Sequence, residues 1–278
     1  MSHTALAIVL AAAIMHASWN AVVKGASDRA LTLAAVALMH ALGGLAILIF
    51  AGLPTNISWP MVFASTAIHY VYYVLLFRAY QLGDLSQVYP IARGMAPALV
   101  AFGSYLILGE VLSVSGIVGV CLVSAGIALI AFQRGAAHAD RRAIGVAAML
   151  GLSIAAYSVA DGVGMRWSHQ PFGYMGWLFL FEAPVVLAVL APRIARRKSI
   201  NLKTFGIGCI GGLLALAAYG MVLYAKTIAP IGAVSAVRES SVIIAALIGV
   251  VFFRERPWGM RIIAALVVAA GVVCLAAG

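Results

Sequence analysis

Hydrophobic residues fill most of this chain in long runs, and short polar or turn-forming stretches separate the runs. About 20 consecutive apolar residues are enough for a helix to cross a bilayer, and windows of that length cover nearly the whole sequence. Turn-forming residues stand between several of them, for example at 52–54, 83–84 and 256–257. We therefore predict ten membrane-spanning helices, at 4–23, 30–52, 60–82, 86–108, 113–132, 143–165, 173–194, 203–227, 232–253 and 258–277.

The composition supports this pattern. Of 278 residues, 64% are hydrophobic and 9% are charged, whereas soluble globular chains are about 45–50% apolar and about 25% charged. The predicted fold class is therefore an all-α polytopic membrane protein, whose surroundings are the lipid bilayer. The formal net charge of +10 then indicates basic loops that meet anionic lipid, and no nucleic acid is expected as a partner.

The helices divide into two halves. The one sizeable polar connection, 133–142, separates a first five-helix repeat (1–132) from a second (143–278). With an odd number of spans in each half, the second half enters the membrane from the opposite side. The sequence therefore predicts an inverted repeat, which is a common plan for secondary transporters.

The two halves also match residue by residue. With one residue of slippage, the segment from Ala79 (AYQLGDLSQVYPIARGMAPALVAFGSYLILGE) lies over the segment from Ala225 (AKTIAPIGAVSAVRESSVIIAALIGVVFFRE). This pairs Arg93 with Arg238 and Glu110 with Glu255. Each half thus carries an arginine inside an apolar run, and matched charged or broken helices are the best sequence pointer to a transporter's binding site.

Basic residues also predict the orientation. Nearly all lysines and arginines lie in the loops after the first, third, fifth, seventh and ninth predicted helices, and the opposite loops hold only Arg166 and Lys226. Because basic loops stay in the cytoplasm, we expect both termini outside.

Five charged residues lie deep in the predicted helices, and each costs about 2.5–3.5 kcal/mol at a helix centre. They are Arg93, Arg238, Glu239, Glu182 and Asp161. In one interpretation, the arginines bind the carboxylate or other anionic group of a solute through bidentate hydrogen bonds. In the other, they form fixed bridges to the acidic residues, and Glu239 is placed to neutralise its neighbour Arg238. The sequence leaves both open.

Two prolines predict a break in the fourth helix. Pro90 and Pro97 each free a backbone carbonyl, which membranes tolerate only where protein or water can satisfy it. Tyr89 lies one turn from Arg93, so we expect this segment to form part of the binding site. Pro184 indicates a similar disturbance near Glu182.

Aromatic and polar side chains on other helices complete the predicted solute site. Aromatic rings supply contact area and cation–π attraction for an amine. The predicted substrate-binding residues, besides the two arginines and Tyr89, are His16, Trp19, Asn20, His69, Tyr73, Tyr157 and Tyr219. His40 has no evident polar neighbour in the sequence, and we treat it as a packing residue.

A buried membrane carboxylate can carry a proton through a transport cycle. Glu182, Asp161 and Glu239 are the candidates, and Glu182 is favoured because no arginine is adjacent to it. Sodium coupling and plain exchange stay open. We predict no cofactor and no metal site, because the three cysteines are isolated and no HExxH or GxSxG motif occurs.

The ends of the two halves read GEVLSVSGIVGVCLVSAGIALI and FRERPWGMRIIAALVVAAGVVCLAAG. With the ten spans, they resemble the EamA type of the drug/metabolite transporter superfamily. The resemblance implies alternating access in the inner membrane and export of an amino acid or similar carboxylate-bearing solute. It does not imply an enzyme. Uptake of a phosphonate, sugar phosphate or quaternary amine remains the alternative, and a homodimer stays open. Relatives often have cytoplasmic termini, unlike the orientation expected here.

Overall fold

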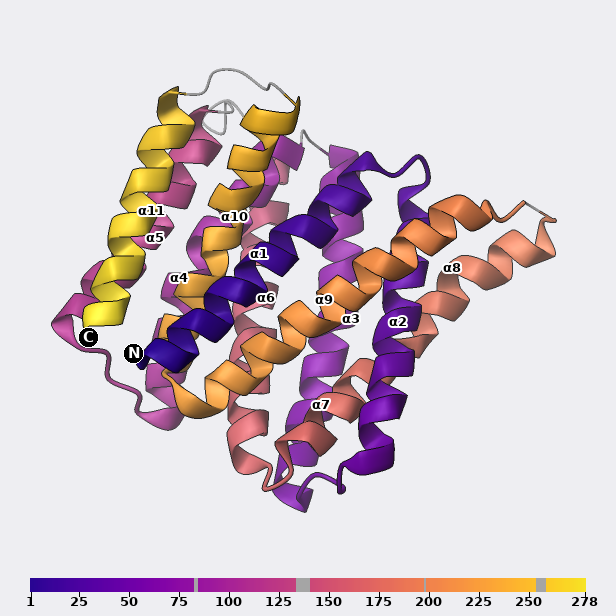
Figure 1. Cartoon of the computed structure of the whole chain (residues 1–278), viewed down its shortest axis with the longest axis horizontal. Coiled ribbons are helices and arrows are strands. Elements are labelled where there is room, and N and C mark those ends of the chain that lie inside the picture. Colours follow the sequence, from indigo (N-terminus) through magenta and orange to yellow (C-terminus); the bar gives the residue numbers. More distant parts are fainter. Residues whose placement is uncertain (83–84, 134–140, 198, 254–258) are drawn as a thin grey trace.

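The computed structural model describes residues 1–82, 85–133, 141–197, 199–253 and 259–278, and this part of the chain is helical without strands (Figure 1). The elements are α1 (His3–Gly25), α2 (Arg29–Phe50), the short 3-10 helix η1 (Asn56–Ser58), α3 (Trp59–Leu82), α4 (Leu85–Leu108), α5 (Val114–Gln133), α6 (Arg141–Trp167), α7 (Pro171–Leu180), α8 (Ala183–Ala195), α9 (Leu202–Ile228), α10 (Ile231–Phe253) and α11 (Gly259–Ala277).

Within the described residues, eight helical segments are long and apolar enough to cross a membrane, and α7 and α8 together make one of them. The shorter apolar helix α5 and the 23-residue helix α10 bring the set to the ten that the sequence predicts. The predicted fold class is therefore confirmed. Side chains cap several helix starts, since Ser2 accepts from the N–H of Ala5 and Asn201 from that of Thr204.

Helix packing follows the inverted repeat. If α1 to α5 correspond to α6, α7–α8, α9, α10 and α11, the contact of α4 with α6 becomes that of α10 with α1. The contact of α3 with α6 likewise becomes that of α9 with α1, and all four contacts are extensive. The corresponding pairs α4–α10 and α5–α11 pack directly on each other, as helices beside a two-fold axis do (Figure 1).

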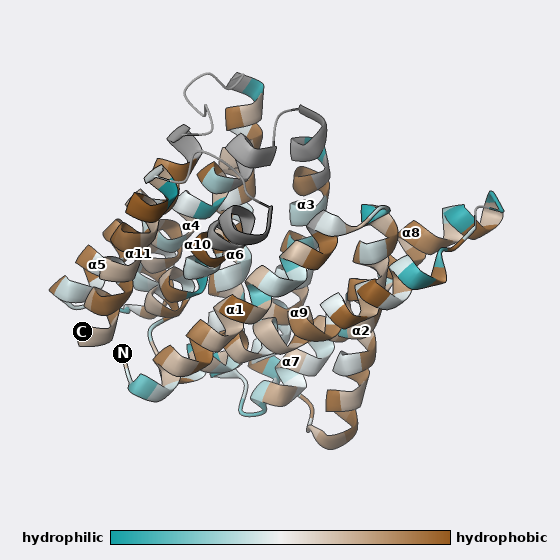
Figure 2. Cartoon of the chain, turned by 45° about the horizontal axis from the view of Figure 1, so that its top comes forward, coloured by the Kyte–Doolittle hydropathy of each residue, from teal (hydrophilic) through white to brown (hydrophobic). Residues whose placement is uncertain are grey.

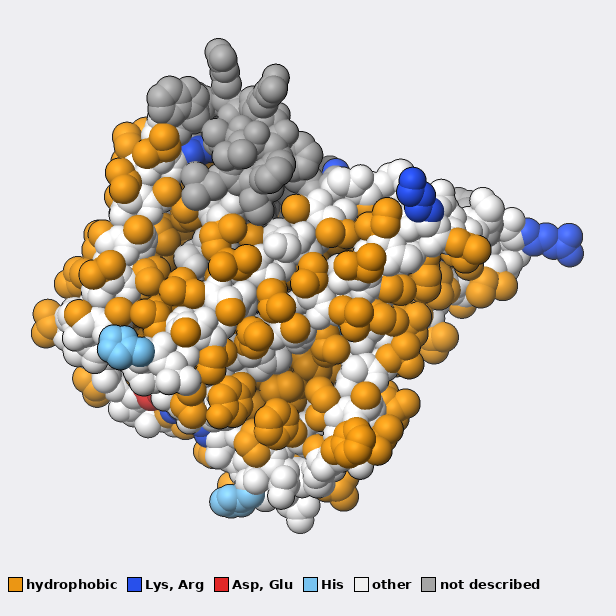
Figure 3. Space-filling model, in the orientation of Figure 1, with side chains coloured by type: hydrophobic (Ala, Val, Ile, Leu, Met, Phe, Trp, Pro, Cys, Tyr) orange, Lys and Arg blue, Asp and Glu red, His pale blue; other side chains and the backbone are white. Residues whose placement is uncertain are grey.

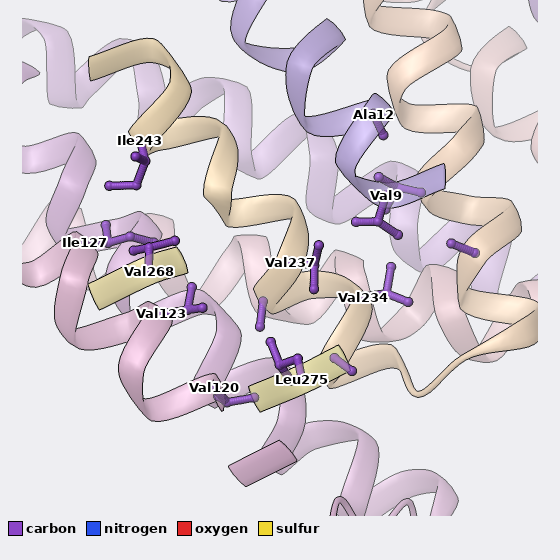
Figure 4. Close-up of a cluster of buried hydrophobic side chains, with 14 of the residues drawn as sticks. Val9, Ala12, Val120, Val123, Ile127, Val234, Val237, Ile243, Val268 and Leu275 are labelled. Carbon is purple, nitrogen blue, oxygen red and sulfur yellow. The ribbon is translucent and has the colours of Figure 1, made fainter. Parts of the chain in front are cut away.

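Glycines allow the closest of these approaches, as small residues do between membrane helices. A Cβ at Gly119 would lie 2.7 Å from the Gly271 carbonyl oxygen across α5 and α11. A Cβ at Gly212 of α9 would lie 2.9 Å from Val36 Cα of α2. Around the α5–α11 contact, α1 and α10 add a buried apolar cluster (Figure 4).

The two ends of the molecule differ. The chain termini meet on one face, where the N-terminal amine of Met1 donates to the carbonyl of Leu275 (Figure 1). We call this the termini face. The opposite face, which we call the basic face, holds the α1–α2 and α8–α9 connections and exposed lysines and arginines (Figure 3). Between them the outer surface is mainly hydrophobic, as a lipid-facing surface should be (Figures 2 and 3).

One of the two predicted helix disturbances is present, and the other is not. α4 continues without interruption through Pro90 and Pro97, so the predicted break in this helix is wrong. The single predicted helix at 173–194 instead consists of α7 and α8, which are separated at Phe181 and Glu182. Pro184 lies in the first turn of α8, where its missing N–H costs no helical hydrogen bond.

Candidate functional site

Four charged or polar side chains from three helices meet in the middle of the bundle. One guanidinium nitrogen of Arg93 (α4) donates to Glu239 Oε1 (α10) at 3.0 Å, and the other lies 2.7 Å from His16 Nε2 (α1). Arg93 is 3% exposed, Arg238 6% and Glu239 not at all. We call His16, Arg93, Arg238 and Glu239 the central ionic cluster. With neutral histidine it carries a net charge of +1, which favours an anion.

The contacts of His16 leave its hydrogen bonding unbalanced. The indole N–H of Trp19 donates to His16 Nδ1 at 3.1 Å. A neutral imidazole accepts at one nitrogen only, yet both nitrogens of His16 face a donor, because Nε2 lies 2.7 Å from a guanidinium nitrogen of Arg93. One of the two contacts therefore brings two donors together, and an oxygen acceptor placed beside them would relieve this conflict.

Arg238, the equivalent of Arg93 in the second half, contacts an aromatic ring. Its guanidinium carbon lies 5.4 Å from the centre of the Tyr219 ring, a cation–π distance. Within the described residues, one terminal nitrogen of Arg238 is buried without a hydrogen-bond partner, as is Oε2 of Glu239. A buried donor and a buried acceptor thus stand unsatisfied on neighbouring residues, and each costs about 1–3 kcal/mol until something binds it.

Aromatic rings surround one side of the cluster. His69 of α3 stacks on Tyr157 of α6 with ring centres 4.1 Å apart, and Tyr157 contacts Tyr219 of α9 at 6.4 Å. Tyr72 contacts both Tyr157 and Tyr73. These rings connect the central ionic cluster to the break between α7 and α8.

The carboxylate of Asp161 binds two tyrosine hydroxyls. Its two carboxylate oxygens accept from the hydroxyls of Tyr174, at 3.2 Å, and of Tyr219. Since the ring of Tyr219 lies 5.4 Å from the guanidinium carbon of Arg238, Asp161 holds that ring in place through the tyrosine hydroxyl. Lys226 of α9 is also fully buried, and it donates to the carbonyl of Ser158, which lies one turn before Asp161 on α6.

Glu182 lies at the break between α7 and α8 and does not cap α8 with its side chain. Its Oε2 is 3.0 Å from His40 Nδ1 on α2 and accepts from the hydroxyl of Tyr73 on α3 at 3.3 Å. The interpretation of His40 as a packing residue is therefore wrong. Sequence reasoning missed it because its partner belongs to another helix of the opposite half.

The described structure brings most of the predicted site residues into one continuous set of contacts. Asn20 lies in α1 beside them, but its amide donates to the backbone carbonyl of His16. Tyr89 and Glu255 cannot be placed, because the side chain of the first and the whole of the second lie outside the described residues. Tyr72 and Tyr174 also belong to this set of contacts, although they are not among the residues that the sequence predicts. The sequence shows Tyr72 directly beside Tyr73, and a search for consecutive tyrosines in helix interiors would have found it.

A ten-helix inverted repeat with buried charges at its centre can be compared with known families. The model of the EamA-like transporter family matches residues 3–132 and again 141–277. The chain belongs to the EamA-like transporter family. This family membership confirms the predicted resemblance, and it makes the chain a multi-pass membrane transporter of small solutes.

The EamA-like fold is also seen in solved structures. One crystal structure, described only as that of a protein, superposes with a TM-score of 0.77 over 99% of both chains at 19% sequence identity. Identity this low shows the fold alone. No curated protein matches the chain. The comparisons therefore establish the architecture of this EamA-like transporter and do not name its solute.

Proposed function

We propose that this protein is a secondary transporter that exports an amino acid, or a similar carboxylate-bearing solute, across the inner membrane by alternating access. The observation that carries the proposal is the pair of unsatisfied buried atoms, one guanidinium nitrogen of Arg238 and Oε2 of Glu239. A zwitterion would satisfy both, because its carboxylate accepts from Arg238 and its ammonium donates to Glu239.

The remainder of the site suits the same solute. A carboxylate beside Arg238 would also accept from the guanidinium of Arg93, one nitrogen of which lies 2.7 Å from His16 Nε2. The rings of Tyr157, Tyr219 and His69 would contact the side chain of the solute. Trp19 acts indirectly, since it holds the ring of His16 through its hydrogen bond to Nδ1.

The closed termini face supports alternating access. There Arg166 of α6 lies 2.6 Å from Glu110 Oε1 and donates to the carbonyls of Lys226 and Ala229. Glu110 Oε2 accepts from the N–H of Ile231. We call these contacts the termini-face clasp. Through Glu110 the clasp joins the first half to α6 and α10 of the second half, and opening it would separate the halves on that side.

Direction and energy source complete the proposal. The basic face is cytoplasmic by the positive-inside rule, so the termini face is external. Export then requires the solute to reach the central ionic cluster from the basic face and to leave past the termini-face clasp. Proton coupling through Glu182, Asp161 or Glu239 would drive it, since a buried carboxylate can load and release a proton.

The test is a thermal-shift panel on the purified protein, followed by tracer exchange in proteoliposomes. Ligands that bind only the folded state raise its stability by mass action. We expect amino acids to stabilise the protein more than plain carboxylates or plain amines of equal size, and the stabilising ones to exchange. If phosphonates, sugar phosphates or quaternary amines stabilise it and amino acids do not, the uptake alternative replaces this proposal.

A further inference from the structure

We propose that His40 and Glu182 form the proton-coupling pair of this transporter, and that they share the transported proton across the contact between its two halves. The inference rests on the proposed transport function and assigns its energy coupling to one site. The evidence is the position of Glu182, the nature of its partners, and the different partners of Asp161 and Glu239.

Glu182 occupies a position where the backbone can move. α7 ends at Leu180 and α8 begins at Ala183, so Glu182 belongs to a non-helical joint inside the bilayer. The joint is held from α3, because the Tyr70 hydroxyl donates to the carbonyl of Phe181. Irregular backbone at membrane depth occurs only where protein or water satisfies it, and such joints are where transporter helices bend.

The partner of Glu182 is a histidine. His40 Nδ1 lies 3.0 Å from Glu182 Oε2, and the side chains are 9% and 12% exposed. Histidine changes charge between about pH 5 and 8, and two coupled buried groups take up and release protons as a unit. The other polar groups near the carboxylate are Tyr73, Tyr70 and His69, all on α3. Among the described residues, His40 is the histidine in contact with the carboxylate, and the hydroxyl of Tyr73 donates to it.

The pair spans the two halves of the repeat. His40 is on α2 and Tyr73 on α3, both in the first half, whereas Glu182 joins α7 and α8 of the second. A single shared proton holds the two side chains together as an ion pair or as its neutral tautomer. A second proton leaves a carboxylic acid beside an imidazolium and weakens the contact. Loading and unloading therefore change how firmly the halves are joined.

The other two carboxylates that are candidates for coupling have different partners among the described residues. Asp161 accepts from two tyrosines, and Glu239 is paired with Arg93, which always carries its charge. Neither carboxylate contacts a histidine in the part of the chain that the structure describes. Ring contacts through Tyr73, Tyr72, Tyr157 and Tyr219 connect the His40–Glu182 pair to Arg238, so a change at the joint can reach the solute.

Two assays separate coupling from transport in proteoliposomes loaded with a radiolabelled L-amino acid mixture. Exchange with equal solute on both sides needs no net proton movement, whereas uphill accumulation under an imposed pH gradient does. We expect His40→Gln and Glu182→Gln to lose gradient-driven accumulation at least about tenfold and to retain exchange. His169→Gln, at an exposed histidine of the α6–α7 connection, is the matched control and should keep both activities.

The outcomes are distinguishable. If the unaltered protein exchanges no amino acid, the proposed solute is wrong. If it exchanges and His40→Gln still accumulates solute under a pH gradient, the coupling pair is wrong. Infrared titration of the purified full chain tests the pair without any solute. A carboxyl band should titrate in the unaltered protein, be absent from Glu182→Gln, and shift by about 1–3 pH units in His40→Gln. An unshifted band overturns the inference. Glu182→Asp, which retracts the carboxylate from His40, replaces His40→Gln if that variant does not fold.

Discussion

Glu239 of α10 pairs with Arg93 of α4, 3.0 Å away, and not with Arg238, which precedes it in the sequence. This pairing joins the two halves of the repeat through a bond that is buried on both sides. It also leaves one nitrogen of Arg238 and one oxygen of Glu239 unsatisfied among the described residues. The two equivalent arginines of the repeat therefore differ, because Arg93 holds the halves together and Arg238 retains donors for a solute.

Replacement of Glu239 by Gln should change the preference of the site for its solutes. The variant keeps an oxygen for Arg93 but removes the negative charge that would face an ammonium group. Since a hydrogen bond to a charged group contributes about 1.5–3 kcal/mol, amino acids should bind about ten- to hundredfold more weakly. Plain carboxylates should bind at least as well as before, because the net charge of the cluster rises. Competition against a bound tracer measures both, and equal weakening of the two classes would contradict the zwitterion model.

Gly44 should not tolerate alanine. A Cβ there would lie 2.6 Å from the carbonyl oxygen of Gly176 and 2.6 Å from the backbone nitrogen of Leu180. Neither atom belongs to a flexible side chain, so the α2–α7 contact must shift, at a cost of about 1–3 kcal/mol. Gly206→Ala is the control, because nothing lies within 4 Å of a Cβ there and alanine favours helix by about 0.5–1 kcal/mol. Unfolding temperatures in detergent should fall for the first and hold or rise for the second.

The basic face should lose stability in acid through one ion pair. Asp28 accepts two hydrogen bonds from Arg193, at 2.6 and 2.8 Å. These bonds, together with the N–H of Leu31, hold the pKa of the Asp28 carboxyl below its usual value. A lowered folded pKa means that the stabilisation is present above the unfolded pKa of about 3.9. It is lost as the pH falls through the folded pKa.

Asp28→Asn tests this assignment, because asparagine still caps α2 but has no charge to lose. The difference in unfolding temperature between the natural chain and the variant should be largest near neutral pH and shrink in acid. A difference that stays constant down to low pH would show that Arg193 does not set the stability of this contact.

The termini-face clasp should stabilise the form in which that face is closed. Arg166→Gln removes the charge that binds Glu110 and weakens the bonds to two carbonyls of the second half. We expect a loss of about 1–3 kcal/mol in detergent and faster exchange past the termini face. The exchanged pair Arg166→Glu with Glu110→Arg should recover only part of the loss, since glutamate cannot donate to the carbonyls. Full recovery would mean that charge alone makes the clasp.

The sequence predicts the helices, their repeat and the residues of the site far better than the contacts among them. Hydrophobic runs fix where helices lie, and the alignment of Arg93 with Arg238 identifies the centre. Which acidic residue each arginine meets depends on how helices of opposite halves are rotated, and no sequence pattern reports that rotation. The contact of His40 escapes prediction for the same reason, because its partner Glu182 belongs to the other half.

The prolines show a second limit. Pro90 and Pro97 predict a break, yet α4 continues through both, because neighbouring helices can hold a kinked helix together. The disturbance predicted near Glu182 does occur, directly before Pro184, where proline lies in the first turn of a new helix. A proline therefore predicts a local weakness of the helix, and packing decides whether the helix ends there.

The central claim is that Arg238 binds the anionic group of the solute. The most direct measurement is equilibrium binding of the best amino acid from the thermal-shift panel to purified Arg238→Gln, with Arg261→Gln, a buried arginine near the start of α11, as the comparison. The account predicts that Arg238→Gln folds and binds about a hundredfold more weakly or not at all, while Arg261→Gln binds as the unaltered protein does. Unchanged binding by a folded Arg238→Gln would contradict the account.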